Sequence, residues 1–299
     1  MAEKPVAAVL GMGETGSGLA AALRPSGLFA SVVGWDPDFD AARAAQRRGV
    51  ADRYAGSAPD AARQAAVVFI ALRGETLVET LTAIGPHLRP GAVACSLLEA
   101  HEVANAAATR ALPASVSFLN ADPVRWEADD FKKGVWCISS TPSAHADAVG
   151  FIAQVGERLE METLFLDARE HDALSAGTRL MPALLGAALL RVAVAQTSWR
   201  EMGRLAGNEL RAATASLEDG GKGLQDQLGG AREHAVRWLD LLVEELTRLR
   251  EGLQDGREAP DYFTAAEEAR AKWLHQRDLP AQAADLPRIE TQERRRFPF

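Results

Sequence analysis

A glycine-rich turn between an apolar strand and a helix is the feature that most constrains this chain. Residues 6–20 read Val-Ala-Ala-Val-Leu-Gly-Met-Gly-Glu-Thr-Gly-Ser-Gly-Leu-Ala, which places Gly11, Gly13 and Gly16 in a GxGxxG motif after an expected strand. A second apolar segment ends at Asp36, 20 residues beyond Gly16. Strand, glycines, helix and acid together are typical of a dinucleotide-binding βαβ unit. We disfavour the alternative, a glycine turn in an unrelated α/β protein, because all four features agree.

The glycines and the acid also predict the cofactor. Gly11 permits the tight turn, Gly13 lets a pyrophosphate approach the backbone, and Gly16 lets helix and strand pack closely. The pyrophosphate is expected at the helix N-terminus, where free N–H groups favour an anion. Asp36 would accept hydrogen bonds from the ribose hydroxyls and repel a 2′-phosphate, so we expect NAD, with NADP less likely. Four neighbouring residues complete the expected cofactor site: Met12, Thr15, Leu72 and Arg73.

Composition restricts the function classes. The net charge of −8 is not that of a nucleic-acid-binding protein, and 47% hydrophobic residues suffice for sizeable cores. The two cysteines, Cys95 and Cys137, have no metal-ligand spacing, so we expect no metal and a reducing cytoplasm. The longest apolar run, Leu180–Leu190, is too short to span a bilayer and predicts a buried helix without membrane association.

Strand and helix patterns alternate in the first half of the chain and predict an α/β fold. Helices are expected at about 14–24, 39–48, 76–87, 100–111 and 144–158. The expected strands are Val6–Leu10, Ser31–Trp35, Ala66–Leu72, Ala92–Leu97, Val116–Asn120, Val135–Ser139 and Glu162–Phe165. This rhythm is typical of a Rossmann-type, doubly wound parallel sheet, which we assign to a dinucleotide-binding domain at residues 1–166.

The remaining sequence predicts an all-helical C-terminal domain at residues 167–277, followed by a mobile tail at 278–299. Its expected elements are a helical segment at 168–205 that Pro182 could break, a loop at 220–223, and helices at 236–253 and Pro260–Leu274. Apolar residues recur every three or four positions in 236–253. We expect one part of that apolar face, Leu239, Leu242, Leu246 and Leu249, to bury against a second subunit in a homodimer.

The order of these segments resembles the prephenate/arogenate dehydrogenase family. The matching stretches are Gly11–Ala20, the strand before Arg73, Pro86–Val93, Glu170–Leu174, Leu180–Leu185 and Ala265–Trp273. The Glu-His-Asp sequence followed by a Leu-x-Pro helix is more particular to that family than the glycine motif. The resemblance implies NAD-dependent oxidation of a cyclohexadienol acid with loss of its ring carboxylate as CO₂.

The resemblance also implies where the reacting groups lie, and here the sequence departs from the family. Asp122, in Asp122-Pro123, stands where the family has a His-Pro histidine that accepts a hydrogen bond from the substrate hydroxyl. Glu99 stands where a serine supports that histidine. Arg179 replaces a second histidine that contacts substrate, and Arg211 is the nearest candidate for a substrate-binding arginine.

The candidate catalytic residues each have a structural alternative. Asp122 is a general base if burial or nearby Glu99 raises its pKa, and otherwise forms an Asp-Pro turn. Glu99 and Asp122 share a proton, or are two solvated acids. His101 approaches the nicotinamide ribose or accepts the proton in place of the missing histidine, or is an exposed helix residue.

The candidate substrate contacts are equally open. His171 contacts substrate with its tautomer fixed by Asp172, or belongs to an acidic helix start. Arg179 binds a substrate carboxylate, or pairs with an acid of the nucleotide domain. Arg73 binds a phosphate or a substrate acid, or blocks the nicotinamide.

We therefore expect a cytoplasmic NAD-dependent oxidoreductase of the prephenate dehydrogenase type, with altered substrate contacts and a small acidic substrate. Two alternatives remain open. One is a nucleotide-binding paralogue that has lost the chemistry and acts as a binding or regulatory protein. The other is an enzyme like the β-hydroxyacid dehydrogenases.

Overall fold

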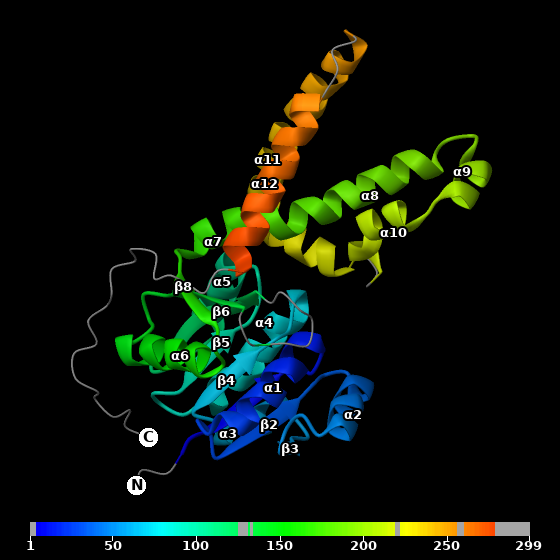
Figure 1. The fold of residues 1–299 in the computed structure, drawn as a ribbon. Coiled ribbons are helices and arrows are strands. Elements are labelled where there is room, and N and C mark those ends of the chain that lie inside the picture. The colour runs from blue at the N-terminus through cyan, green and yellow to red at the C-terminus, as the bar shows by residue number, and fades with distance from the viewer. Residues whose placement is uncertain (1–3, 125–130, 132–133, 219–221, 256–259, 279–299) are drawn as a thin grey trace. The chain divides into compact units, whose positions relative to one another are not determined.

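A single mixed sheet organises the first part of the chain in this computed structural model, which describes residues 4–124, 131, 134–218, 222–255 and 260–278 (Figure 1). The described residues form eight strands in the order β3-β2-β1-β4-β5-β6-β7-β8. All neighbours pair in parallel except β6 and β7. The strands are β1 (Val6–Leu10), β2 (Ser31–Trp35), β3 (Arg53–Tyr54), β4 (Val67–Ile70), β5 (Val93–Ser96), β6 (Ser117–Val124), β7 (Val135–Ser140) and β8 (Glu162–Phe165).

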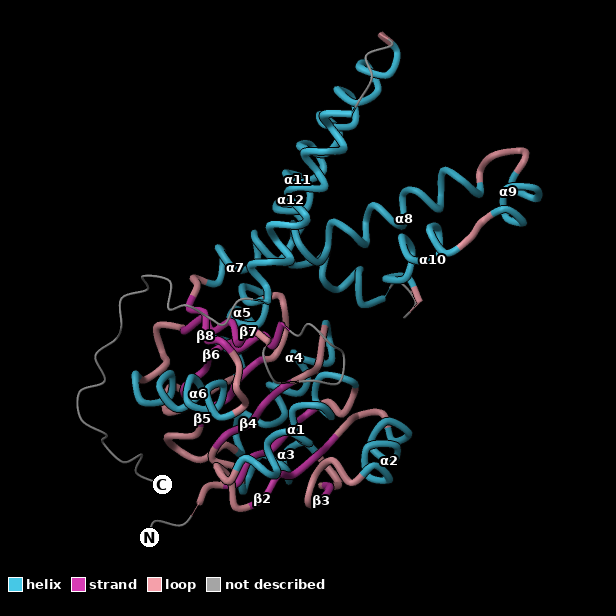
Figure 2. Tube along the Cα trace, viewed as in Figure 1, coloured by secondary structure: helices cyan, strands magenta, loops and turns pink. Residues whose placement is uncertain are grey.

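Helices cover both faces of this sheet (Figure 2). Helices α1 (Glu14–Ser26) and α6 (Ala146–Arg158) pack on one face, where the ring of Phe29 meets those of Phe69 and Phe151 edge-on. The opposite face carries α3 (Ala58–Gln64), α4 (Gly74–Ile84) and α5 (His101–Ala111) over buried residues such as Ala8, Leu10 and Ile70. The edge helix α2 (Phe39–Arg48) lies beside β3, and a short turn, η1 (Gly85–His87), follows α4.

From Ala168 onward the described residues form helices joined by short turns. The elements are α7 (Ala168–Ser175), a π-helical turn η2 (Ala176–Leu180), α8 (Met181–Val194), α9 (Trp199–Leu205), α10 (Asn208–Thr214), η3 (Ala215–Leu217), α11 (Lys222–Gln254) and α12 (Pro260–Asp278). Helix α11 is kinked at Ala231, whose backbone is not helical. Packing divides the chain near this kink into one compact unit that runs to Ala235 and a second that begins at Val236.

These elements confirm the predicted fold class, a Rossmann-type α/β sheet followed by helices. The sheet is parallel as predicted except at one place, where β7 runs antiparallel to β6. Strand β6 is also longer than expected and includes Asp122 and Pro123, so the alternative of an Asp-Pro turn is wrong. Strand β3 and helix α3 were not predicted, since each is too short to show a periodic pattern.

The second half departs from its predicted outline in two places. The segment at 168–205 was expected to be one helix. It is instead interrupted by the π-helical turn η2, and helix α8 ends at Val194, before α9 begins. Of the loop expected at 220–223, residues 220 and 221 lie outside the described residues and Lys222 already begins α11. The predicted tail lies outside the described residues from 279 on, and Asp278 ends α12.

Helix α8 is less buried than its apolar sequence predicts. Leu185, Leu189 and Val192 expose 37%, 48% and 64% of their surfaces. The helical run Ala168–Val194 is long and apolar enough to cross a membrane by length and composition alone. Core helices of water-soluble proteins pass the same test, and this run also carries the buried polar residues His171 and Asp172.

Candidate functional site

The glycine-rich turn has the geometry that a dinucleotide needs. Gly11 adopts a left-handed φ of 95°, and a Cβ there would lie 2.6 Å from the carbonyl oxygen of Ala71. A Cβ on Gly16 would lie 1.8 Å from the carbonyl oxygen of Gly11, so only glycine fits. A Cβ on Gly13 would meet nothing within 4 Å, and no side chain caps the helix that begins after it. The helix N-terminus is therefore open to an anion.

Asp36 lies beside this turn at the end of β2. One carboxylate oxygen accepts the backbone N–H of Met12 and the other accepts that of Asp38 at 2.8 Å. The carboxylate is thus fixed next to the first turn of the glycine motif, where the ribose of a bound dinucleotide would lie. The open Gly13, the uncapped helix and the fixed acid fit a dinucleotide.

A polar pocket of about 240 Å³ opens at the carboxyl ends of β4, β5 and β6. In open parallel sheets ligands bind at this edge. The pocket brings together several predicted site residues from segments far apart in the sequence. Its lining is Thr15, Arg73, Leu97, Glu99, Asp122, Pro123, Val124 and Arg179.

Glu99 is held by three partners at this pocket. Its two oxygens accept hydrogen bonds from the Arg73 guanidinium, both at 3.3 Å, and Arg179 lies 4.0 Å away. The amide of Gln227, on α11, also donates to Glu99. The Glu99 side chain is 7% exposed, against 46% for Arg73 and 36% for Arg179. The acid is therefore buried behind the two cations that face the pocket.

Asp122 lies between two basic side chains, and its own side chain is 3% exposed. Arg179 donates a short hydrogen bond to its Oδ2, and His171 Nε2 lies 3.4 Å from the same oxygen. Burial alone would raise the pKa of Asp122, but Arg179 and His171 outweigh it and lower that pKa below its usual value. The raised pKa that Asp122 needs as a general base is therefore wrong. Arg179 contacts both Asp122 and Glu99.

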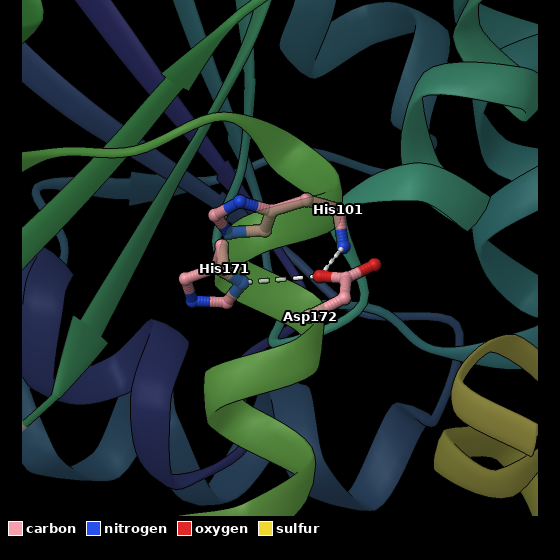
Figure 3. A group of neighbouring side chains, drawn as sticks. All are labelled: His101, His171 and Asp172. Carbon is pink, nitrogen blue, oxygen red and sulfur yellow. Dashed lines mark hydrogen bonds and ion pairs between the residues drawn. The ribbon is translucent and has the colours of Figure 1, made fainter. Parts of the chain in front are cut away.

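Behind Asp122, a buried histidine pair lies against Asp172 (Figure 3). The rings of His101 and His171 stack at 3.6 Å between centroids and 5° between planes. Asp172 Oδ1 lies 3.0 Å from His171 Nδ1 and also accepts the backbone N–H of His101 at 2.8 Å. Burial would lower the pKa of His171, but hydrogen bonds to Asp122 and Asp172 raise it above its ordinary value. The imidazolium form is thus stabilised between two carboxylates.

His171, when protonated, completes an alternating sequence of acidic and basic side chains, which we name the charge chain. From the interior to the pocket its members are Asp172, His171, Asp122, Arg179, Glu99 and Arg73. Each interior member is flanked by partners of opposite charge. Buried charges persist when they are paired in this way, because an unpaired one would cost several kcal/mol.

His101 is not brought to the pocket. It is fully buried, so the alternative of an exposed helix histidine is wrong. Burial and the neighbouring His171 lower the pKa of His101 to about 3, so its ring is neutral. Its Nδ1 contacts the Ser139 hydroxyl, while its Nε2 has no hydrogen-bond partner in the described part of the chain. A catalytic role for His101 stays a prediction.

His101, His171 and Asp172 are close enough to suggest a metal site, with ligand atoms within 4.8 Å of one another. The stacked rings argue against this in the arrangement seen. A metal ion lies about 2 Å from a ligating histidine nitrogen, in the plane of its ring. Since the two ring planes are almost parallel and 3.6 Å apart, no single ion lies in both planes.

The remaining predicted residues divide into two groups. Met12 and Leu72 are buried around the glycine turn, where the Leu72 side chain would touch a Cβ on Gly11 at 3.0 Å. Arg211 is exposed on α10, and no described hydrogen bond or ion pair joins its side chain to the charge chain. Its assignment to the substrate stays a prediction, as do the roles of the other site residues.

Sequence reasoning missed two polar contacts of this site. Gln227 reaches Glu99 from α11, 128 positions away, and nothing in the local sequence marks it. Ser139 contacts His101 from β7, and because four consecutive positions of that strand are buried, no alternation of buried and exposed positions marks it.

The fold and the glycine turn define the class of protein: a Rossmann-type nucleotide-binding domain followed by a helical region. Residues 19–128 match the family model described as "Prephenate dehydrogenase, nucleotide-binding domain". A comparison with curated proteins gives no match. Residues 19–128 of this chain are therefore similar to the nucleotide-binding domain of the prephenate dehydrogenase family.

Solved structures of that family have the same fold. Prephenate dehydrogenase from A. aeolicus, in complex with hydroxyphenyl propionate and NAD+, matches with a TM-score of 0.79 and 14% identity over 92% of this chain and 99% of that chain. Arogenate dehydrogenase from Synechocystis matches with a TM-score of 0.71 and 16% identity, covering 91% of this chain and 99% of that one. At these identities the likeness is one of fold alone.

Proposed function

We propose that this protein is an NAD-dependent dehydrogenase that oxidises the hydroxyl group of a small acidic substrate. Its closest functional type would be prephenate or arogenate dehydrogenase, with an altered set of substrate contacts. The family of its nucleotide-binding domain and the shared fold support the reaction class. The residues of the pocket support the acidic substrate.

One observation carries the cofactor part of this proposal. Gly13 leaves open space in front of an uncapped helix N-terminus, and Asp36 is fixed beside it. A diphosphate can approach the free N–H groups only if no Cβ stands there. A carboxylate at Asp36 favours ribose hydroxyls over a 2′-phosphate, which favours NAD over NADP.

The exposure of the charged side chains in the pocket supports the second part of the proposal, an acidic substrate. The two cations are exposed to 46% and 36%, whereas Glu99 and Asp122 are exposed to 7% and 3%. A ligand entering the pocket therefore meets Arg73 and Arg179 before it meets the acids. Guanidinium groups fixed by buried carboxylates are well placed to bind a substrate carboxylate, because little side-chain entropy remains to be lost.

The chain's own groups divide the remaining work. NAD, when bound, supplies the acceptor for a hydride from the substrate carbon. Asp122 lines the pocket as a carboxylate and can accept a hydrogen bond from the substrate hydroxyl. Arg179 holds this carboxylate in place and also faces the substrate. Leu97 and Val124 supply apolar wall beside these charges.

Nucleotide binding is tested by a matched pair of glycine substitutions. Gly13→Ala adds a methyl group that meets no atom of the protein, so the melting temperature should stay unchanged while affinity for NADH falls at least tenfold. Gly150→Ala on α6 also meets no atom; it should leave NADH affinity unchanged and, as a helical glycine, should not lower the melting temperature. Unchanged NADH affinity in Gly13→Ala, measured by fluorescence titration, would remove the cofactor assignment.

One observation favours a second candidate, a nucleotide-binding protein without turnover. The carboxylate at the family's histidine position is held ionised by Arg179 and His171, which weakens it as a base. A turnover screen with prephenate, arogenate and simple hydroxyacids separates the two. Tight NADH binding without turnover of any of them would favour the second candidate.

A further inference from the structure

We propose that His171 is the residue that finally takes up the reaction's proton, with Asp122 passing that proton from the substrate hydroxyl. This inference rests on the proposed dehydrogenase function and adds a second residue to its proton path. Because His171 does not line the pocket, its position alone does not indicate this role.

The geometry makes Asp122 the only link between the pocket and His171 among the described residues that line the pocket. Asp122 lines the pocket, whereas His171 does not and is 4% exposed. Asp122 Oδ2 lies 3.4 Å from His171 Nε2, and a small shift of either side chain brings them to hydrogen-bond distance. A proton reaching His171 from the pocket therefore passes over this carboxylate.

Asp172 prepares His171 for this role. The contact of Asp172 Oδ1 with Nδ1, at 3.0 Å, keeps a hydrogen on Nδ1 and leaves Nε2 as the nitrogen that gains or loses a proton. Asp172 is itself fixed, since its two oxygens accept the backbone N–H groups of His101 and Glu102 at 2.8 and 2.9 Å. The orientation of the imidazole is thus set by the start of α5.

The groups that face His171 from the surrounding elements favour its charged form. Asp122 on β6 and Asp172 on α7 stabilise the imidazolium, and Arg179 on η2 opposes it. His101 on α5 is neutral, and burial raises the pKa of Cys137 on β7 to about 12, so neither carries a charge at neutral pH. The two carboxylates dominate, so the pKa of His171 lies above its ordinary value.

The proton balance of the step follows from this arrangement. During oxidation the carbon–hydrogen electron pair leaves as hydride, and the hydroxyl proton moves to Asp122 as the carbonyl forms. Asp122 then protonates Nε2 and becomes a carboxylate again, while neutral His171 becomes an imidazolium. Oxidation therefore needs neutral His171 and should speed up as pH rises through its pKa, while the reverse reduction should slow down.

Histidine NMR tests the coupling without any turnover. In full-length protein with ¹⁵N-labelled histidine rings, the His171 signal, assigned by its loss in His171→Gln, should titrate above 6.5. Asp122→Asn should move this midpoint down by at least one pH unit. His234→Gln, which removes another histidine near an acid, Glu102 at 3.9 Å, should leave it unchanged. A midpoint below 6.5, or one unmoved by Asp122→Asn, overturns the proposal.

The pH profile of turnover tests the role itself. His171→Gln should lower turnover by roughly 10²-fold, the size expected for losing an acid–base group, and flatten the rise with pH while NADH affinity stays unchanged. An unchanged profile in His171→Gln, with normal NADH binding and turnover, overturns the relay alone. Absence of NADH binding by the unmodified protein instead removes the proposed function, and the relay with it.

Discussion

The carboxylate of Asp172 accepts the backbone N–H of His101 at 2.8 Å, although the two residues are 71 positions apart in the sequence. His101 is the first residue of α5, and the residue before it, Ala100, has no side chain that could cap the helix. Asp172 also accepts the next N–H, from Glu102, at 2.9 Å. Asp172, on α7, thus acts as the N-cap of α5, and the same carboxylate holds His171.

Removal of this cap should destabilise the protein. Asp172→Ala leaves the buried N–H of His101 and the partly buried N–H of Glu102 without this partner, and should cost about 2–4 kcal/mol of unfolding free energy. Asp167→Ala, which removes the local N-cap of α7, should cost about 1 kcal/mol because solvent can replace the lost bond. Urea unfolding monitored by circular dichroism gives both values, and equal costs would contradict the special role of Asp172.

The glycine motif should separate structural from functional glycines. Gly16→Ala places a Cβ 1.8 Å from the Gly11 carbonyl oxygen and should cost more than about 3 kcal/mol, or prevent folding, because backbone must move. Gly13→Ala should leave stability unchanged. Thermal melting of the two variants without nucleotide checks this, and a stable Gly16→Ala protein would show that the close contact of α1 with β1 is wrong.

Asp36 should set the preference for NADH over NADPH. We expect Asp36→Asn to weaken NADH binding by about 1.5–3 kcal/mol, the value of a charge-assisted hydrogen bond, and to reduce discrimination against NADPH. Asp40→Asn, on the first turn of α2, is the control and should change neither affinity. Fluorescence titration measures all four constants. Tighter binding of NADPH than NADH by the unmodified protein would contradict the assignment.

Arg179 should act on substrate binding more than on turnover. Arg179→Ala removes an exposed guanidinium from the pocket and leaves Asp122 with one cationic partner. We expect KM for an acidic substrate to rise by a larger factor than kcat falls, the sign of lost uniform binding. Steady-state kinetics measure both constants, with Arg211→Ala on exposed α10 as the comparison. A larger effect of Arg211→Ala would move the substrate site to α10.

We propose that the protein forms a homodimer through its helical region. On α11, Leu239 and Leu246 expose 37% and 51% of their surfaces. Exposed apolar residues that are grouped in this way, unlike isolated ones, indicate an interaction surface. Leu246→Glu should then lower the mass seen by sedimentation at micromolar concentration by half. Phe39→Glu, at another exposed apolar residue, should leave the mass unchanged. An unmodified protein that sediments as a monomer would contradict the proposal.

Local signals made the first part of the fold predictable. The glycine motif, the strand boundaries of β1 and β2 and the acid at position 36 follow from short-range sterics and from the period of the strands. The antiparallel turn into β7 did not follow, because pairing direction depends on a partner far away in sequence. The extra residue in η2 is equally invisible, since the apolar pattern of this segment continues through it.

The site was predictable as a set of residues but not as a set of partners. Glu99, Asp122 and Arg179 were recognised from their places at strand ends and on the first helix of the second half. The pKa of Asp122 was misjudged, because it depends on Arg179, 57 positions away, rather than on burial or on Glu99 alone. Charge state in a buried site is a property of the assembled contacts.

The charge chain also constrains how this protein can change over evolutionary time. Replacing a single interior member by a neutral residue would leave a buried charge of one sign uncompensated, which costs far more than replacing a neighbouring acid and base together. Substitutions among relatives should therefore occur in coupled pairs, acid with base. Sequences that retain the whole alternation would form a lineage distinct from those that carry the family's histidines, and the boundary between them would mark where the chemistry diverged.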